Sequence, residues 1–310
     1  MYDVLIIGSG PAGLSAAIYS RRANLNVAVI EKEYMGTGQI AESGKVDNYP
    51  GLPGISGYDL GEKFREHAAG LGTEFIENEV VDIVYEDNAQ TYILKLTDES
   101  EISARAVIYA AGAYKRQAGV PGEKEYNGRG VSYCALCDGA FYKGKKVAVL
   151  GGGDTAFHDA LYLSDICEKV YLVHRRKEFR AADSLVEALK SKRNVEFILE
   201  DSVKEILGDK AVNKVKLVSG NEIEVNGVFV AYGAIPQTGL LKHLVKTDDR
   251  GYVVSDETGI TFRISDDKQM PGLYVAGDAR EKVIQQVVTA VADGANAATS
   301  ASEYIRNSLI

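Results

Sequence analysis

The sequence predicts an α/β fold with two Rossmann-like dinucleotide-binding domains, the second inserted into the first. Two observations carry this prediction. A strand, a glycine-rich turn, a helix and a second strand follow one another at the start of the chain, and the same series returns near its middle. A further strand and turn near the end of the chain complete the first domain. With 310 residues, 45% of them hydrophobic, the chain is long enough for two domains.

Composition and charge exclude several classes of protein. The 35 basic residues are outnumbered by 44 acidic ones, and a formal net charge of -9 argues against a general nucleic-acid-binding surface. No apolar run reaches the ~20 residues of a membrane span, and the first residues enter an apolar strand without a basic leader. We therefore expect a cytoplasmic protein that binds neither nucleic acid nor membrane.

The first βαβ unit reads YDVLIIGSGPAGLSAAIYSRRANLNVAVIEKE. Its glycines Gly8, Gly10 and Gly13 form the G-x-G-x-x-G pattern, in which the first permits a tight turn, the second lets a pyrophosphate approach the backbone and the third lets the helix pack on the strand. Glu31 follows the second strand, 18 positions after Gly13, where a carboxylate can accept hydrogen bonds from ribose hydroxyls. The unit therefore predicts a dinucleotide site.

The second βαβ unit reads KKVAVLGGGDTAFHDALYLSDICEKVYLVHRRKEFR. Gly151, Gly153 and Ala156 form the G-x-G-x-x-A variant of the same pattern. Here Arg175 occupies the place that corresponds to the acid of the first unit, 19 positions after Ala156. Arg176 follows directly, and a further arginine stands four residues later. Guanidinium groups bind a 2′-phosphate that a carboxylate would repel, so the predicted ligand is NADPH.

The end of the chain supplies the partner of the first glycine turn. A short strand from 273 to 276 leads into Gly277 and Asp278, and a long apolar-periodic helix follows. A carboxylate at this junction can bind the ribityl hydroxyls of a flavin, and the helix N-terminus offers positive potential to the pyrophosphate. We interpret the first site as an FAD site.

The order of these motifs predicts the domain organisation. The FAD motif comes first, its Gly-Asp partner comes last, and the NADPH unit lies between them. We expect a discontinuous FAD domain of residues 1–113 and 243–310, and an inserted NADPH domain of residues 114–242. The crossings are expected near 113–119 and 239–247, where a two-segment linker can act as a hinge.

The stretch SYCALCDGA places Cys134 and Cys137 two residues apart in the inserted domain. A zinc site needs four ligands. Beyond this pair the chain offers only Cys167 and four histidines, without metal-ligand spacing, so no metal is expected. A structural disulfide across so short a loop would add little stability and would open in a reducing cytosol. A redox dithiol explains the spacing best, because one thiolate attacks a disulfide and its neighbour resolves the mixed intermediate. We expect Cys167 to be a buried apolar side chain.

Together these features give the chain an end-to-end resemblance to the low-molecular-weight thioredoxin reductases of the flavoprotein disulfide reductase class. The segments that carry it are GSGPAGLSAAIY, GTGQI, DNYPG, YCALCDG, GGGDTA, HRRKEFR and YVAGDARE, in that order. The resemblance implies tightly bound FAD, NADPH as donor, a homodimer, and thioredoxin or a thioredoxin-like protein as acceptor.

The resemblance and the motifs together assign the site residues. Those expected at FAD are Gly8, Gly10, Pro11, Ala12, Gly13, Glu31, Gln39, Asn48, Gly112, Gly277, Asp278 and Gln286. Those expected at NADPH are Gly151, Gly153, Asp154, Thr155, Ala156, His174, Arg175, Arg176 and Arg180. The resemblance makes Cys137 the thiol that faces the flavin, Cys134 the thiol that attacks the protein substrate, and Asp138 the acid/base group. A simple turn or cap role for Asp138 is the alternative, since Asp before Gly is common in turns.

The chain departs from the family pattern at two positions. Thr37 replaces the first of two glycines before Gln39, so the loop beside the flavin is expected to differ. Gln285 stands where relatives commonly have an arginine, which removes a charge from the start of the last helix.

The resemblance implies NADPH-dependent reduction of a thioredoxin-like disulfide through FAD and the cysteine pair, with one domain rotating against the other between half-reactions. Other functions use the same scaffold: reduction of a glutaredoxin-like or peroxidase partner, or oxidation of a small-molecule dithiol by oxygen. A flavin-carrying binding module without turnover is an alternative of a different class.

Overall fold

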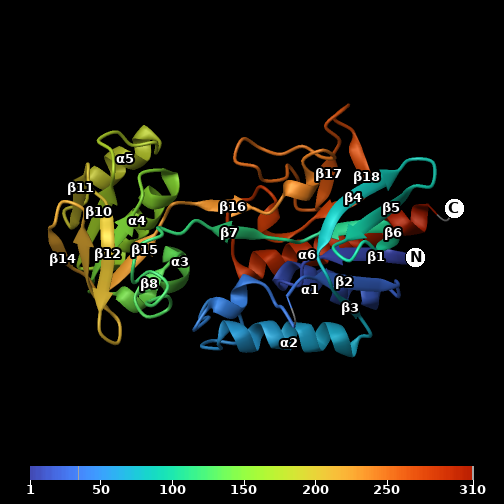
Figure 1. The fold of residues 1–310 in the computed structure, drawn as a ribbon, viewed down its shortest axis with the longest axis horizontal. Coiled ribbons are helices and arrows are strands. Elements are labelled where there is room, and N and C mark those ends of the chain that lie inside the picture. Colours follow the sequence, from blue (N-terminus) through green and yellow to red (C-terminus); the bar gives the residue numbers. More distant parts are fainter. Residues whose placement is uncertain (34, 309–310) are drawn as a thin grey trace. The chain divides into compact units, whose positions relative to one another are not determined.

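The structure is a computed structural model that describes residues 1–33 and 35–308, and it divides into two compact units (Figure 1). Unit 1 contains Met1–Tyr114 and Ile235–Ile310, and unit 2 contains Lys115–Ala234. The return to unit 1 thus lies eight residues before the boundary at 242/243 that the sequence suggested. The physical reason is the 3₁₀ turn η3, Gly239–Leu241, whose Leu241 is fully buried in a core cluster of unit 1.

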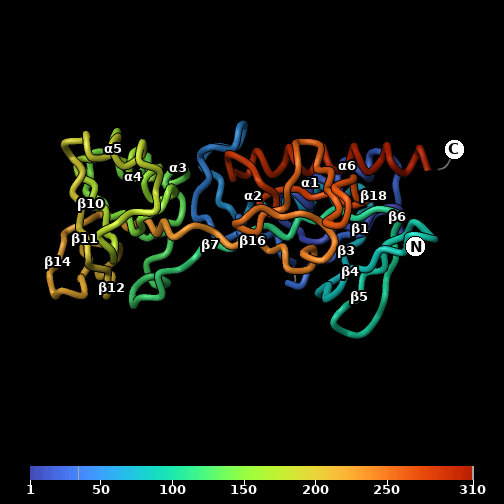
Figure 2. The backbone as a smooth tube through the Cα atoms, turned by 90° about the horizontal axis from the view of Figure 1, so that it is seen from above, coloured from blue at the N-terminus to red at the C-terminus, as the bar shows by residue number. Residues whose placement is uncertain are grey.

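Unit 1 is built on an eight-stranded sheet in the order β17-β18-β6-β1-β2-β3, with β5 also pairing with β6 and β4 pairing with β5. β1, β2, β3, β6 and β18 run parallel to one another, and β17 pairs antiparallel with β18. β4 and β5 form an antiparallel pair joined by a short loop (Figure 2). Their bounds are β1 Tyr2–Ile7, β2 Val27–Glu31, β3 Glu74–Glu77, β4 Val80–Glu86, β5 Thr91–Leu96, β6 Glu101–Tyr109, β17 Ile260–Phe262 and β18 Gln269–Val275.

Helices α1 and α6 pack tightly against each other and bury the apolar side of the central strands. The helices of unit 1 are α1 Pro11–Arg22, α2 Gly57–Gly70 and α6 Val287–Asn307, with 3₁₀ turns η1 Gln39–Glu42 and η4 Gly277–Ala279. Their close approach depends on small residues: a Cβ added at Gly294 would lie 2.1 Å from the Ala12 carbonyl oxygen. This packing brings the start of α1 and the start of α6, nearly 280 residues apart in the chain, to the same end of the sheet.

Unit 2 repeats the α/β plan on a smaller scale, as the sequence predicted. A five-stranded parallel sheet has the order β11-β10-β9-β15-β8, and a separate antiparallel sheet has the order β12-β13-β14. The strand bounds are β8 Val131–Ser132, β9 Lys146–Leu150, β10 Lys169–His174, β11 Val195–Leu199, β12 Val203–Gly208, β13 Val212–Leu217, β14 Glu222–Glu224 and β15 Gly227–Val230. The helices are α3 Ala135–Asp138, α4 Asp154–Ile166 and α5 Asp183–Lys190, with the 3₁₀ turn η2 Gly139–Tyr142.

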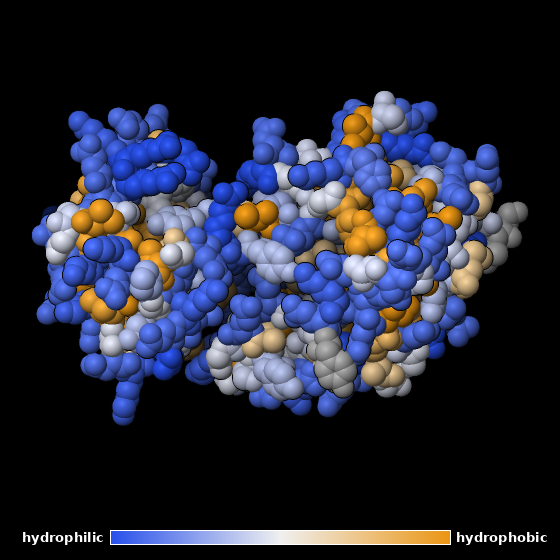
Figure 3. Space-filling model, in the orientation of Figure 1, coloured by the Kyte–Doolittle hydropathy of each residue, from blue (hydrophilic) through white to orange (hydrophobic). Residues whose placement is uncertain are grey.

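The two chain segments that pass between the units pair with each other as short strands, β7 Ala113–Lys115 and β16 Ala234–Pro236. A backbone hydrogen bond from Arg116 N to the Gly233 carbonyl, 3.0 Å long, extends this pairing. Hydrophilic side chains cover most of the face in Figure 3, with apolar residues in small groups. Within the described part of the chain, no helix is long and apolar enough to cross a membrane.

Candidate active site

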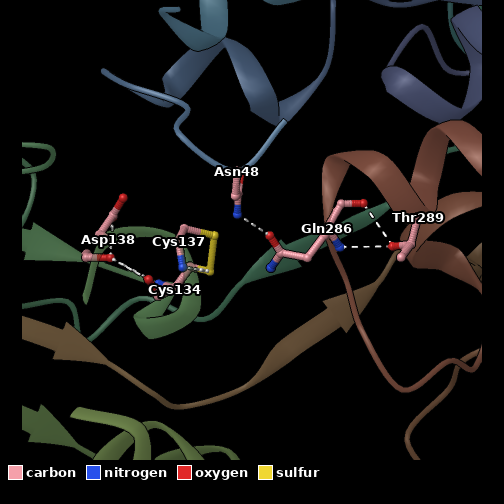
Figure 4. The surroundings of a disulfide bond; sticks show 7 residues. Asn48, Cys134, Cys137, Asp138, Gln286 and Thr289 are labelled. Atoms are coloured by element: carbon pink, nitrogen blue, oxygen red, sulfur yellow. Dashed lines mark hydrogen bonds between the residues drawn. A yellow bond between two sulfur atoms is a disulfide. The ribbon is translucent and has the colours of Figure 1, made fainter. Parts of the chain in front are cut away.

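The cysteine pair lies at the end of strand β8 in unit 2. Cys134 and Cys137 form a disulfide with their Cα atoms 5.3 Å apart (Figure 4). Cys134 is the N-cap of the short helix α3, and its sulfur accepts the Cys137 N–H at 3.2 Å. Both cysteines are half-buried. The short helix thus holds an oxidised pair whose two residues are only partly buried.

Asp138 is the last residue of the same helix, and Ser132 holds its carboxylate. The Ser132 hydroxyl donates to Asp138 Oδ2 at 2.6 Å, and Ser132 Oγ accepts the Cys134 N–H at 3.1 Å. Burial raises the pKa of Asp138, and the hydrogen bond from Ser132 opposes this rise. A carboxyl group with a raised pKa beside a redox disulfide is suited to proton transfer. Sequence reasoning found Asp138 but missed Ser132.

The first glycine turn in unit 1 gives each glycine a different task. Gly8 has a φ of 101°, which L side chains rarely adopt. A Cβ at Gly13 would lie 1.9 Å from the Gly8 carbonyl oxygen, so Gly13 is required for helix packing. At Gly10 the backbone is extended, and an added Cβ would contact only Gly38 Cα, at 3.9 Å. The protein itself therefore leaves the space at Gly10 open.

Glu31 is held by Ser9, a buried residue that sequence reasoning did not select. The Ser9 N–H donates to Glu31 Oε2 at 3.0 Å, and the Ser9 hydroxyl lies 2.8 Å from the same oxygen and 2.6 Å from the Gly36 carbonyl. These contacts fix the carboxylate at the end of β2, beside the glycine turn. Its remaining lone pairs are suited to hydroxyl donors such as those of a ribose.

Three further predicted FAD residues of unit 1, Gln39, Asn48 and Gln286, form two contacts that link distant segments. Asn48 Nδ2 donates to Gln286 Oε1 at 2.8 Å, which connects the loop before α2 to the start of α6 (Figure 4). Gln286 is the N-cap of α6 and forms a capping box with Thr289. The Gln39 side-chain amide donates to the Ala113 carbonyl in strand β7. The structure thus brings together residues that the sequence separates by more than 200 positions.

Asp278, which is half-buried, contacts a group of buried charges that the sequence analysis missed. Lys282 Nζ lies 3.1 Å from Asp278 Oδ1 and 3.1 Å from Asp293 Oδ2, and Arg280 Nη2 lies 2.8 Å from Asp293 Oδ1. Asp293 also accepts the Gly277 N–H at 3.1 Å. Although Lys282 is near it, Asp278 Oδ1 is buried with no hydrogen-bond partner among the described residues. An unsatisfied carboxylate oxygen of this kind is suited to a hydroxyl ligand.

The remaining predicted residues of unit 1 occupy the same end of its sheet. Pro11 is the first residue of α1, and the buried Ala12 follows it. A Cβ at Gly277, whose φ is 75°, would lie 2.8 Å from Ala12 Cβ, so this glycine allows η4 to approach α1. Gly112 has a φ of 70°, in the left-handed region that favours glycine, and an added Cβ there meets no atom within 4 Å. The positive φ of Gly112, rather than crowding by neighbouring atoms, is the reason for a glycine at this position.

The second glycine turn, in unit 2, repeats this division of tasks. Gly151 has a φ of 152°, and a Cβ there would lie 2.7 Å from Ala156 Cβ. Gly153 is extended, and an added Cβ would meet nothing within 4 Å. Thr155 lies in the exposed first turn of α4, directly before the buried Ala156. Space for a ligand is again left open at the middle glycine.

Two hydrogen bonds connect the arginine segment to this glycine turn. The Arg180 N–H donates to the Gly152 carbonyl at 2.8 Å, and Asp154 Oδ1 accepts the Ala182 N–H at 2.9 Å. His174 is buried, and a Cβ at Gly152 would lie 2.4 Å from its ring. His174 and Asp154, both predicted at NADPH, therefore help to support the loop.

The three arginines of this segment, Arg175, Arg176 and Arg180, are exposed. In the part of the chain that the structure describes, none of them forms an ion pair with a carboxylate. Desolvation lowers the pKa of the neighbouring His174, and the positive charge of the arginines contributes to this. The end of β10 is thus a positive group of side chains that an anion could neutralise.

Two further positions bear on the sequence analysis. Thr37 is buried, and a Cβ at Gly61 of α2 would lie 2.4 Å from Thr37 Oγ1, so Gly61 provides the room for this larger residue. Cys167 is a free, buried cysteine, and burial raises its pKa to about 11. A thiol in this state is not a nucleophile at neutral pH, which agrees with the packing role expected for Cys167.

The sequence model of the pyridine nucleotide-disulphide oxidoreductases matches residues 2–294. The chain belongs to this family. It is 41% identical over 311 residues to the thioredoxin reductase of Bacillus subtilis (strain 168), covering 98% of this chain and 95% of that one. It is therefore a flavoprotein oxidoreductase of the thioredoxin reductase type, a family whose members use FAD and NADPH.

Solved structures agree with this family assignment. Thioredoxin reductase from Streptococcus pyogenes MGAS5005 is 39% identical, with a TM-score of 0.92 and 99% of each chain covered. Thioredoxin reductase from Giardia duodenalis is 32% identical, with a TM-score of 0.89, covering 98% of this chain and 99% of that one. The predicted fold class, two Rossmann-like domains with one inserted in the other, is confirmed by these relatives.

Proposed function

We propose that this enzyme reduces the disulfide of thioredoxin, or of a thioredoxin-like protein, with electrons from NADPH that pass through FAD and the Cys134–Cys137 pair. One observation carries the proposal: a half-buried C-x-x-C disulfide lies next to Asp138, whose pKa burial raises, in a unit that also contains the glycine turn and the unpaired arginines. This arrangement supplies an electron-accepting disulfide, a proton carrier and a nucleotide site within one folded unit.

FAD fits the residues of unit 1. The open space at Gly10 suits a pyrophosphate, Glu31 suits the ribose, and the unsatisfied Asp278 Oδ1 suits a ribityl hydroxyl. Gln39, Asn48 and Gln286 then lie in the flavin's surroundings. When bound, FAD relays two electrons from the nicotinamide to the disulfide. The chain's own residues bind and orient it.

NADPH fits the residues of unit 2. The open space at Gly153 and the N-terminus of α4 suit the pyrophosphate. Arg175, Arg176 and Arg180 are exposed and form no ion pair with a carboxylate of residues 1–33 or 35–308, which suits a site for the 2′-phosphate. Because the arginine segment is attached to the glycine turn, its positive charge lies beside that turn. A freely solvated basic loop would have no such fixed position.

The exchange with the partner protein balances as a dithiol–disulfide reaction. After reduction, Cys134 gives up its proton and its thiolate attacks the partner's disulfide, forming a mixed disulfide; the first partner sulfur leaves and takes up that proton as a thiol. Cys137 then loses its proton to Asp138 and attacks the Cys134 sulfur, which releases the second partner thiol as Asp138 returns the proton. Two electrons and two protons pass to the partner, and the enzyme's disulfide is restored.

We also propose that the inserted unit rotates between the two half-reactions. The pair and the nicotinamide site are both on unit 2, so they would use the flavin in turn. The chain crosses between the units only at β7 and β16 in the described residues, a connection of two short strands that suits a hinge. A cytoplasmic homodimer is the form that we expect to carry out this cycle.

Anaerobic titration of the purified enzyme with NADPH tests the proposed function. We expect the flavin absorbance to bleach and then to recover when oxidised thioredoxin is added. NADH in place of NADPH tests the alternative donor, and glutaredoxin-like and peroxidase proteins in place of thioredoxin test the alternative acceptors. Recovery of the flavin absorbance with oxygen alone would favour a dithiol oxidase. Failure of NADPH to bleach the flavin would contradict the proposal and favour a binding module.

A further inference from the structure

The hydroxyl of Ser132 occupies a position between Asp138 and the backbone of the attacking cysteine. Ser132 ends strand β8 and is buried. Its Oγ lies 2.6 Å from Asp138 Oδ2, accepts the Cys134 N–H at 3.1 Å, and lies 3.3 Å from the Cys134 carbonyl oxygen. Because a serine has one hydrogen to donate, it can satisfy either the carboxylate or the carbonyl, but not both at once.

We propose that Ser132 is a positioning residue for disulfide exchange, whose hydroxyl holds the ionised Asp138 carboxylate and turns to the Cys134 carbonyl when Asp138 takes up a proton. This inference rests on the proposed function of the cysteine pair. It adds to that function a residue that acts through Asp138.

The hydrogen bonds balance in both protonation states. When Asp138 is ionised, the Ser132 O–H donates to Oδ2 and the Cys134 N–H donates to Ser132 Oγ. When Asp138 has accepted the proton of Cys137, its own O–H donates to Ser132 Oγ, and the serine hydrogen turns to the Cys134 carbonyl 3.3 Å away. The serine oxygen has two lone pairs, so it accepts from Asp138 and from the Cys134 N–H together. No buried donor loses its partner in either state.

The Ser132 hydroxyl, rather than a second charged group, opposes the rise that burial causes in the pKa of Asp138. The elements that pack most extensively against α3 are η2 and α4, and strand β8 precedes it in the chain. Of their titratable groups, Tyr142 of η2 interacts with Asp138, and its pKa rises to about 12 through burial first and the carboxylate second. The titratable groups of α4 are Asp154, His158, Asp159, Tyr162 and Asp165. None of these is among the causes that shift Asp138, where burial comes first and Ser132 second. After reduction, the thiols of Cys134 and Cys137 join this set.

The direction of the effect follows from the charge state that Ser132 stabilises. Donation to the carboxylate favours the ionised form, so removing the hydroxyl raises the pKa of Asp138 further. The inflection that Asp138 contributes to the pH profile of exchange then moves to higher pH, whether Asp138 acts as acid or as base. Losing one hydrogen bond to a charged group corresponds to about a tenfold change in rate at neutral pH.

The test uses the full-length holoenzyme, reduced by NADPH and mixed with oxidised thioredoxin over a series of pH values. Ser132→Ala is expected to move the inflection to higher pH and to slow exchange about tenfold at neutral pH. Ser132→Thr keeps a hydroxyl, and Ser132→Val has the same shape without one. We expect Thr to restore the profile and Val to reproduce that of Ala. If Ser132→Ala fails to fold, the comparison of Thr with Val carries the test.

An Asp138→Asn background separates positioning from a merely structural role. There Ser132→Ala is expected to produce no further change in the pH profile, because no carboxylate remains to be held. A wild-type pH profile in Ser132→Ala would overturn the inference. So would a loss of exchange rate in the Asp138→Asn background equal to the loss that Ser132→Ala causes in the wild-type enzyme. Failure of the proposed function looks different: the wild-type enzyme itself would then transfer no electrons to thioredoxin.

Discussion

Changing Gly10 to alanine is expected to weaken FAD binding without harming the fold. The glycine precedes α1 with a φ of -68° and a ψ of 179°, an extended conformation that any L-residue adopts. An added Cβ would contact only Gly38 Cα, at 3.9 Å, which is an ordinary van der Waals distance. The one group that needs the space is therefore a ligand that approaches the backbone.

The expected magnitudes follow from these contacts. Replacing glycine by alanine at a compatible position stabilises by about 0.4–1 kcal/mol through the unfolded chain. Alanine is a poorer N-cap residue than glycine, and this destabilises the folded state by a similar amount. The apoprotein should thus keep its unfolding free energy to within about 1 kcal/mol. Losing a charge-assisted contact to the pyrophosphate weakens FAD binding by about 1.5–3 kcal/mol, or roughly 10- to 100-fold.

The assay compares three glycine variants of the apoprotein by FAD titration, followed by flavin fluorescence, and by thermal melting. Gly70→Ala in α2 is the neutral control, because an added Cβ there meets nothing within 4 Å. Gly13→Ala is the packing control, because its Cβ would lie 1.9 Å from the Gly8 carbonyl oxygen and destabilise the apoprotein. Wild-type FAD affinity in Gly10→Ala, or an apoprotein that melts as early as Gly13→Ala, would refute the reasoning.

Four more expectations follow from the same structure. Gly153→Ala, where an added Cβ meets nothing within 4 Å, should keep flavin but raise the Michaelis constant for NADPH, and an unchanged constant would place the pyrophosphate elsewhere. Changing Arg175 and Arg176 to Ala should weaken NADPH by about 2–4 kcal/mol and change NADH use little, whereas equal weakening of both nucleotides would contradict the 2′-phosphate site. Cys137→Ser should leave Cys134 free to trap a mixed disulfide with a thioredoxin that lacks its resolving cysteine, detected on a non-reducing gel, and trapping by Cys134→Ser instead would reverse the two roles. Glu123→Gln should lower the unfolding free energy of the apoprotein by about 2–3 kcal/mol in a denaturant titration, because the buried Glu123 accepts hydrogen bonds from Ala118 N, Gly119 N and the Tyr133 hydroxyl, and an amide N–H₂ would face one of these donors. The exposed Glu168→Gln is its matched control, and equal stability of the two variants would contradict the assigned contacts.

The sequence predicted the parts of the structure that local chemistry determines. Both glycine turns, the strands and helices around them and the cysteine pair follow from patterns that span about 30 residues. The return crossing between the units was placed eight residues late, because a sequence does not show that Leu241 is buried in unit 1. Boundaries of this kind depend on tertiary packing rather than on local propensity.

The polar contacts that hold the site residues in place were not predictable in the same way. Glu123 is one of 44 acidic residues, and only the fold brings Ala118, Gly119 and Tyr133 to its carboxylate. Asp293 did leave a signal: it is the one acid in the otherwise small and apolar run TAVADGANAA, and a single charge in such a helix indicates a buried partner. The identity of that partner, Arg280 with Lys282, appears only in the structure.

The two glycine turns explain why the middle glycine is the informative one in each unit. The first glycine of each turn is crowded, because a Cβ at Gly8 would lie 2.6 Å from the Ala110 carbonyl oxygen and one at Gly151 would lie 2.7 Å from that of Ala231. The third position is Gly13 in unit 1, where a Cβ would lie 1.9 Å from the Gly8 carbonyl oxygen, whereas in unit 2 it is Ala156. Gly10 and Gly153 are alike in being extended and uncrowded, so neither backbone strain nor packing accounts for a glycine at these two positions. A requirement shared by both turns and absent from the protein's own contacts is best assigned to the phosphates of a bound dinucleotide.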